Sequence, residues 1–125
     1  MKITIETIPN DQQRYPTVGD WFFDLKGDLV IKVSQMGDWR YEALVAVHEL
    51  VEVLLCKHQG VSQEAVDKFD MSFEKNRGDQ CLDEPGDHPE APYVKQHCIA
   101  TAVERLLAAE LGVMWKEYDN TIQSL

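Results

Sequence analysis

The chain has 125 residues, of which 12 are Lys or Arg and 22 are Asp or Glu, so its formal net charge at pH 7 is −10. A charge of this sign argues against binding to nucleic-acid phosphates or to anionic membranes, because both depend on Lys and Arg side chains. The hydrophobic share of 44% and the charged share of 27% are typical of a globular protein rather than a disordered one. At this length we expect one domain over residues 1–125. Three roles for the charge stay open: a bound cation, a basic protein partner, or simple solubility.

The start of the chain and its cysteine content favour a cytoplasmic location. Residues 1–4 lead into polar sequence rather than into the apolar core of a secretory signal. No apolar run approaches the roughly 18 residues needed to cross a bilayer. The cysteines are Cys56, Cys81 and Cys98, an odd number that does not suggest a disulfide framework. We therefore expect free thiols in a reducing compartment.

Residues 1–36 are predicted to form a small β-rich part. Isoleucines alternate imperfectly with polar residues over 1–8, which favours a short strand. Two β-rich runs, 21–24 and 29–33, flank a short turn that contains Gly27. This arrangement predicts a β-hairpin.

Capping residues predict two helices after the hairpin. Asp38 suits the N-cap of a helix over about 39–58, and Gly60 suits its end. Ser62 suits the N-cap of a second helix, which has an acidic residue in its first turn and runs to about Asn76.

A loop, a third helix and a short tail are predicted for the rest of the chain. Gly, Pro and Asp are concentrated in residues 77–90, as is typical of a loop. Pro92 suits the first turn of a helix over about 91–111, which ends near Gly112. The tail, residues 113–125, is expected to add a last helical turn that packs back on the core.

The predicted fold class is therefore α+β, with a small N-terminal hairpin or sheet followed by three helices. The β-rich part covers residues 1–36, the helical part 39–112 and the tail 113–125. Trp39 and Tyr93 stand at the starts of their predicted helices, and we expect both to be core aromatics.

The first helix has ionisable residues on its apolar face. At about 100° per residue, His48 and Glu52 fall in one stripe with Leu44, Val45 and Leu55. A buried carboxylate is costly unless it is paired or bound to a metal.

The other two helices repeat this pattern. Asp70 falls among the apolar residues of the second helix, and His97 and Glu104 share the inner face of the third. Each residue alone is explained by a hydrogen-bonded core histidine or by a pair with Arg105 or Lys95. Their coincidence on three helices favours one metal site between them.

The first helix also contains the sequence His48-Glu49-Leu50-Val51-Glu52. Side chains at i and i+4 of a helix project together, so His48 and Glu52 can hold one cation. Glu49 is rotated by about 100° from His48, which suits it to take a proton from a metal-activated water rather than to bind the ion.

This sequence resembles the HExxH helix of the zincin metallohydrolases, with Glu52 in place of the second His. The strand at 29–33 is similar to the edge strand that precedes the active-site helix in a minimal zincin. The resemblance implies hydrolysis of a peptide or amide bond, with His48 and Glu52 as zinc ligands and Glu49 as the general base. The third ligand would come from a later helix, with His97 or Glu104 as candidates. The Glu at position 52 is equally consistent with a relative that has altered ligands or has lost catalysis.

A second pattern competes with the first. Glu49 and Glu52, followed by Asp67 and Asp70, resemble the ExxE…ExxD pattern of the all-α NTP pyrophosphatases of the MazG type. That resemblance implies Mg²⁺ held by carboxylates of two helices and gripping the phosphates of a nucleotide. Oxygen ligands suit Mg²⁺, whereas the imidazole of His48 suits zinc, iron or manganese better.

Two further hypotheses concern the loop region. Asp87 and His88 lie in the stiff segment 83–93, where they could lean over a site formed by the helices. Residues 64–90 hold 9 acidic and 3 basic side chains. Such a surface also suits a non-enzymatic inhibitor or decoy, of the phage or mobile-element type, that binds a basic partner.

The sequence thus predicts a small metal-dependent hydrolase acting on a peptide or small-molecule substrate. Its ligands are His48, Glu52 and His97, its base is Glu49, and its ion is zinc, with Mg²⁺ or Mn²⁺ as alternatives. No direct nucleic-acid or membrane binding is expected, and a homo-oligomer stays open. The alternate ligands, or groups that orient the ligands, are Glu104, Asp70, His88 and Asp87.

Overall fold

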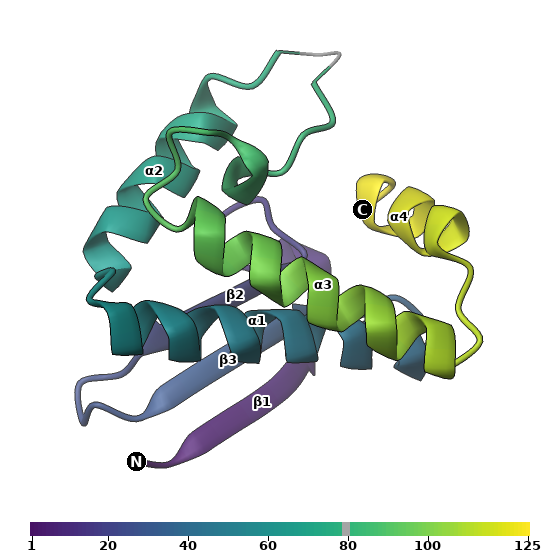
Figure 1. Ribbon diagram of the computed structural model, residues 1–125, viewed down its shortest axis with the longest axis horizontal. Coiled ribbons are helices and arrows are strands. Elements are labelled where there is room, and N and C mark those ends of the chain that lie inside the picture. The colour runs from purple at the N-terminus through teal and green to yellow at the C-terminus, as the bar shows by residue number, and fades with distance from the viewer. Residues whose placement is uncertain (79–80) are drawn as a thin grey trace.

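A three-stranded sheet at the N-terminus is followed by four helices in the computed structural model, which describes residues 1–78 and 81–125 (Figure 1). The predicted α+β class is confirmed. Two residues of the predicted loop 77–90 lie outside the described part of the chain.

The sheet has the strand order β1-β3-β2, so the strand that is last in sequence lies in the middle. Strands β2 (Gly19–Phe23) and β3 (Leu29–Ser34) form the predicted antiparallel hairpin. Strand β1 (Ile3–Ile8) pairs with the other edge of β3 in parallel. Strand β2 begins two residues before the predicted run.

Helix α1 (Trp39–Gln59) packs against β2 and β3 and covers one face of the sheet (Figure 1). The β3 side chains that point to this helix are fully buried, as the period of two in a strand requires. Together with the inner face of α1 they form the core, which includes Leu29, Ile31, Val33, Leu44, Val45 and Val53.

The predicted caps define the first two helices. The Asp38 carboxylate accepts the backbone N–H of Arg40 at 2.9 Å, and Gly60 ends α1 with a φ of 77°. Ser62 accepts the backbone N–H of Ala65 at 3.2 Å and begins α2 (Gln63–Lys75). The positive φ at Gly60 allows the chain to turn sharply into α2.

Helix α3 (Val94–Glu110) packs against α1, and the tail folds into a short helix α4 (Trp115–Gln123). Placing Pro92 in the first turn of α3 was wrong. The helix begins after Tyr93, whose carbonyl accepts the N–H of His97 at 2.9 Å, so the proline lies in the preceding turn.

The two predicted core aromatics differ. Tyr93 is buried with 3% exposure, as expected, whereas Trp39 is 69% exposed and the prediction for it was wrong. Trp39 precedes His48 by nine residues, which at about 100° per residue places it on the opposite side of the helix. It therefore faces away from the core that His48 faces.

Two smaller expectations concern the thiols and the membrane. Cys56, Cys81 and Cys98 are all free. Within residues 1–78 and 81–125, no helix combines the length and the apolar composition that a bilayer span requires.

Candidate metal centre

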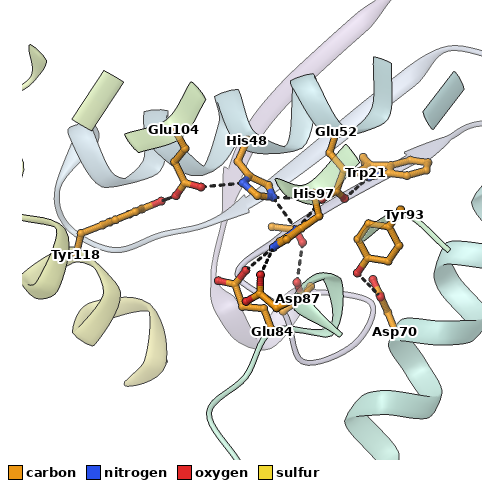
Figure 2. Close-up of polar contacts among 12 residues, drawn as sticks. Trp21, His48, Glu52, Asp70, Glu84, Asp87, Tyr93, His97, Glu104 and Tyr118 are labelled. Atoms are coloured by element: carbon orange, nitrogen blue, oxygen red, sulfur yellow. Dashed lines mark hydrogen bonds and ion pairs between the residues drawn. The ribbon is translucent and has the colours of Figure 1, made fainter. Parts of the chain in front are cut away.

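Helices α1 and α3 bring together three side chains that can bind a metal. His48 and Glu52 come from one face of α1, and His97 comes from the facing side of α3 (Figure 2). His48 Nε2 lies 3.2 Å from Glu52 Oε2 and 3.2 Å from His97 Nδ1. His97 Nδ1 lies 3.0 Å from Glu52 Oε2, which closes a triangle of ligand atoms. The ligand set predicted from the sequence therefore converges.

The spacing of these atoms suits one small ion. With metal–ligand bonds of about 2.0–2.1 Å and tetrahedral geometry, adjacent ligand atoms lie roughly 3.3 Å apart. The observed separations of 3.0–3.2 Å are close to that value. Two imidazoles and one carboxylate are also a donor set used by catalytic zinc sites. The residues present therefore fit a divalent metal.

Glu104 orients His48 from the other side of the ring. His48 Nδ1 lies 2.7 Å from Glu104 Oε1, and the hydroxyl of Tyr118 donates to Glu104 Oε2 at 2.5 Å (Figure 2). Tyr118 is fully buried on α4, so the C-terminal helix takes part in the site. An acceptor on the second nitrogen of a ligating histidine is the usual way that its ring is oriented. Glu104, an alternate ligand in the sequence analysis, has this orienting position.

Glu52 is held by the sheet as well as by the histidines. Its Oε1 accepts the indole N–H of Trp21 at 3.0 Å, which leaves Oε2 for the triangle of ligand atoms. Trp21 lies on β2 and is 4% exposed. The hairpin therefore fixes the direction in which Glu52 points.

The second nitrogen of His97 faces the loop before α3. Its Nε2 lies 3.1 Å from Glu84 Oε2 and 3.2 Å from Asp87 Oδ1, at the two ends of the short turn η2 (Pro85–Asp87). Gly86 lies against the ring, and a Cβ at that position would overlap it. The predicted role of Asp87 near the site thus has a structural basis, and Glu84 accompanies it.

Charge is closely balanced in this cluster. Burial opposes a charged His48, but the hydrogen bonds to Glu104 and Glu52 outweigh it and raise the pKa of His48 to about 11. Burial also opposes a charged His97, and contacts with Glu52 and Glu84 raise its pKa to about 10. The pKa of Glu52 is lowered to about 2, because the two histidines outweigh the effect of burial. A divalent cation can replace the two imidazole protons with no change in net charge.

Glu49 lies on α1 with His48 and Glu52, and it lines the same cavity as the three side chains that can bind a metal. Burial, followed by the nearby charge of Glu52, raises its pKa well above the ordinary value. A Cβ at Gly19 would lie 2.7 Å from Glu49 Oε1, so the glycine on β2 provides the space that the carboxyl occupies. A raised pKa is what a general base working near neutral pH requires.

A cavity of about 370 Å³ opens beside the cluster. Its wall includes His48, Glu49, Glu52 and His97. This volume is within the range of small-molecule sites, which is roughly 300–1,000 Å³.

Asp70 lines the same cavity but does not join the ligands. It accepts the hydroxyl of Tyr93 at 2.5 Å and that of Tyr15 at 3.0 Å. Burial raises the pKa of Asp70 to about 7, against the lowering effect of the two tyrosines. Its neighbour Asp67 is paired with Arg14 at 3.2 Å.

His88 does not reach the cluster either. Its ring packs near Phe69 and Phe73, and its Nδ1 accepts the backbone N–H of Glu90 at 3.1 Å. Among the described residues it belongs to neither of the two groups able to hold an ion.

Several residues of the site were not singled out in the sequence. They are contributed by other elements, and helical periodicity does not reveal partners across elements. Only two of these residues had a signal in the sequence. Gly19 is an isolated glycine in a strand, which marks a close approach of another group, and Glu84 is an acid near the start of a helix. The residues are Tyr15, Gly19, Trp21, Glu84 and Tyr118.

No protein-family model, curated protein or solved structure matches the chain. The class of protein is therefore inferred from the site itself.

Proposed function

We propose that the chain is a zincin-like, metal-dependent hydrolase, in which His48, Glu52 and His97 hold a zinc ion. The observation that carries the proposal is the convergence of three ligand atoms from two helices within 3.2 Å, at the wall of a cavity. A hydrogen-bonded cluster of structural residues does not require such a cavity beside it.

The donor set favours zinc over magnesium. Imidazole nitrogens suit zinc, whereas Mg²⁺ prefers oxygen ligands. Three protein ligands leave a fourth position for a water or a substrate, as catalytic zinc sites do. Manganese, which carboxylate and water ligands suit, is the alternative.

The side chains around the site have different roles in the proposed hydrolysis. When bound, the ion supplies Lewis acidity, which lowers the pKa of a water and polarises a carbonyl. The Glu49 carboxylate would accept a proton from the attacking water and return it to the leaving group. Glu104 and Tyr118 hold His48 in one orientation, and Trp21 does the same for Glu52. The substrate is a peptide or amide small enough for one of its groups to enter the cavity.

The competing functions have less support in the contacts. A pyrophosphatase site requires Asp67 and Asp70 beside Glu49 and Glu52, and all four carboxylates line the cavity. The side chain of Asp67 is paired with Arg14, however, and that of Asp70 accepts from two tyrosines, so both carboxylates are already engaged. The hypothesis of an acidic decoy does not explain why His48, Glu52 and His97 converge.

Metal content tests the ligand set. We expect about one tightly held zinc ion that is lost in His48→Ala and in Glu52→Gln. His58→Ala and Glu64→Gln are matched controls, because both residues are exposed, His58 on α1 and Glu64 on α2, and neither belongs to the triangle of ligand atoms. Far-UV circular dichroism shows whether each variant is folded. Folded His48→Ala protein that keeps its zinc would refute the site.

Turnover tests the chemistry separately. Zinc-loaded protein is assayed against a mixed peptide library, and Glu49→Gln is expected to retain zinc while losing activity. Mg²⁺-dependent turnover of nucleotides that is lost in Asp70→Asn would instead favour the pyrophosphatase. A basic partner bound in a salt-sensitive manner, without turnover of either substrate, would favour the decoy.

A further inference from the structure

A second group of metal-competent atoms lies on the far side of the His97 ring. Glu84 Oε2 and Asp87 Oδ1 are within 3.2 Å of His97 Nε2, and the three side chains together can hold an ion (Figure 2). The proposed hydrolase chemistry uses only Nδ1 of this histidine, so Nε2 and the two carboxylates take no direct part in it.

The geometry at Nε2 is not that of a hydrogen bond. The side chain of His97 is 7% exposed, and its Nε2 forms ion pairs with two carboxylate oxygens at 3.1 and 3.2 Å, but among residues 1–78 and 81–125 it has no acceptor in hydrogen-bond alignment. Both oxygens are therefore off the line along which an N–H would donate, because an aligned acceptor at this distance would make the bond. Buried nitrogens usually have an aligned hydrogen bond in folded proteins, so the sideways position of both oxygens requires an explanation.

An ion between the three atoms provides that explanation. Around an octahedral ion with bonds of about 2.1 Å, adjacent ligand atoms lie roughly 3.0 Å apart and at right angles. Oxygens that stand beside the Nε2 axis, at 3.1 and 3.2 Å, match this arrangement better than they match an acceptor on the axis.

The turn that carries the carboxylates is built against the ring. Glu84 and Asp87 flank Gly86, which is buried and has no side chain between its backbone and the His97 ring. The turn can therefore approach closely enough for its two ends to reach Nε2. The side chains of Glu84 and Asp87 are 48% and 63% exposed, which leaves water access to the remaining coordination positions.

We propose that Glu84, Asp87 and His97 Nε2 form a second divalent-cation site, so that the His97 ring bridges two ions. Two carboxylates and one imidazole, with water at the other positions, suit Mn²⁺ or Zn²⁺. His97 gives up its remaining ring proton to solvent when the second ion binds, and no redox step is involved. The inference rests on the proposed function only in that the two sites share His97.

Metal stoichiometry after equilibrium dialysis tests the second site. The full chain is dialysed against Zn²⁺ or Mn²⁺ and analysed for bound metal. We expect two ions per chain for the wild type and one for the Glu84→Gln/Asp87→Asn double variant. The matched control, Asp83→Asn/Glu90→Gln, removes the same charge from the same loop and is expected to keep two.

The outcomes separate the two proposals. The second site is overturned if the wild type binds one ion and the double variant still binds it, with equal or roughly 10–100-fold lower affinity. The two carboxylates would then be groups that orient His97. If Glu52→Gln loses one of two ions while the double variant loses the other, both sites stand. One ion lost only in the double variant supports the outer site and refutes the inner one. Mn²⁺ loading also gives a spectroscopic test, since two ions on one imidazole show magnetic coupling that the double variant abolishes.

Discussion

Replacing Asp70 with Asn is expected to change how the stability of the chain depends on pH. The Asp70 carboxyl is 7% exposed and accepts hydrogen bonds from Tyr15 and Tyr93. Asn has nearly the same shape, and its amide can accept from one hydroxyl and donate to the other. The main loss is therefore the ability to ionise.

The magnitude follows from the pKa difference between the folded and unfolded chain. Burial raises the pKa of Asp70 from 3.8 to about 7, so the folded chain holds this proton more tightly than the unfolded one. The stability gained from the proton is complete below the unfolded pKa and is lost as the pH rises through about 7. Three pKa units correspond to about 4 kcal/mol, of which about 2–3 kcal/mol falls between pH 5 and pH 8.

Urea unfolding of chelator-treated protein, followed by tryptophan fluorescence, measures this difference. The free energy of unfolding of Asp70→Asn, relative to wild type, is expected to increase by about 2–3 kcal/mol from pH 5 to pH 8. Asp11→Asn, at an exposed carboxyl near the N-terminus, is the control for loss of one charge. A difference that stays constant across this pH range would show that Asp70 ionises equally in both states and would refute the reasoning.

Three more substitutions test other parts of the structure. Glu104→Gln weakens the acceptor that orients His48 and is expected to lower zinc affinity 10–100-fold, as measured by competition with a chelating dye. Gly19→Ala places a methyl group where the Glu49 carboxyl lies, so kcat for the hydrolysis found in the library screen should fall while zinc content is unchanged. Trp39→Ala is expected to change the free energy of unfolding by less than about 0.5 kcal/mol, because the indole is mostly exposed; a larger loss would show that it packs on the core.

The elements that local patterns define were predictable. The boundaries of α1 and α2 follow from Asp38, Gly60 and Ser62, which act on their own neighbours in the chain. The inward direction of His48 and His97 follows from the period of a helix, which needs no knowledge of the partner.

Contacts between elements were not predictable in the same way. A helical wheel shows which face of α1 is buried but not that Trp21 of the hairpin reaches Glu52, or that Tyr118 of the tail reaches Glu104. The parallel pairing of β1 with β3 was also not predictable from local patterns, because it joins residues 26 positions apart, as in the pair Ile3 and Leu29. The tail was expected to add one turn, whereas α4 has nine residues, with the Tyr118 ring buried and its hydroxyl on Glu104.

The division of the three ligands between α1 and α3 has a kinetic consequence. Glu52 and His97 are 45 positions apart, so no short peptide contains the complete set, and the chain between them must close a long loop to bring the two side chains together. The α1 segment alone offers only the pair His48 and Glu52. An ion held by both helices would lose ligands whenever α1 and α3 separate, so its rate of exchange would respond to the local opening of this one helix pair and not only to unfolding of the whole chain.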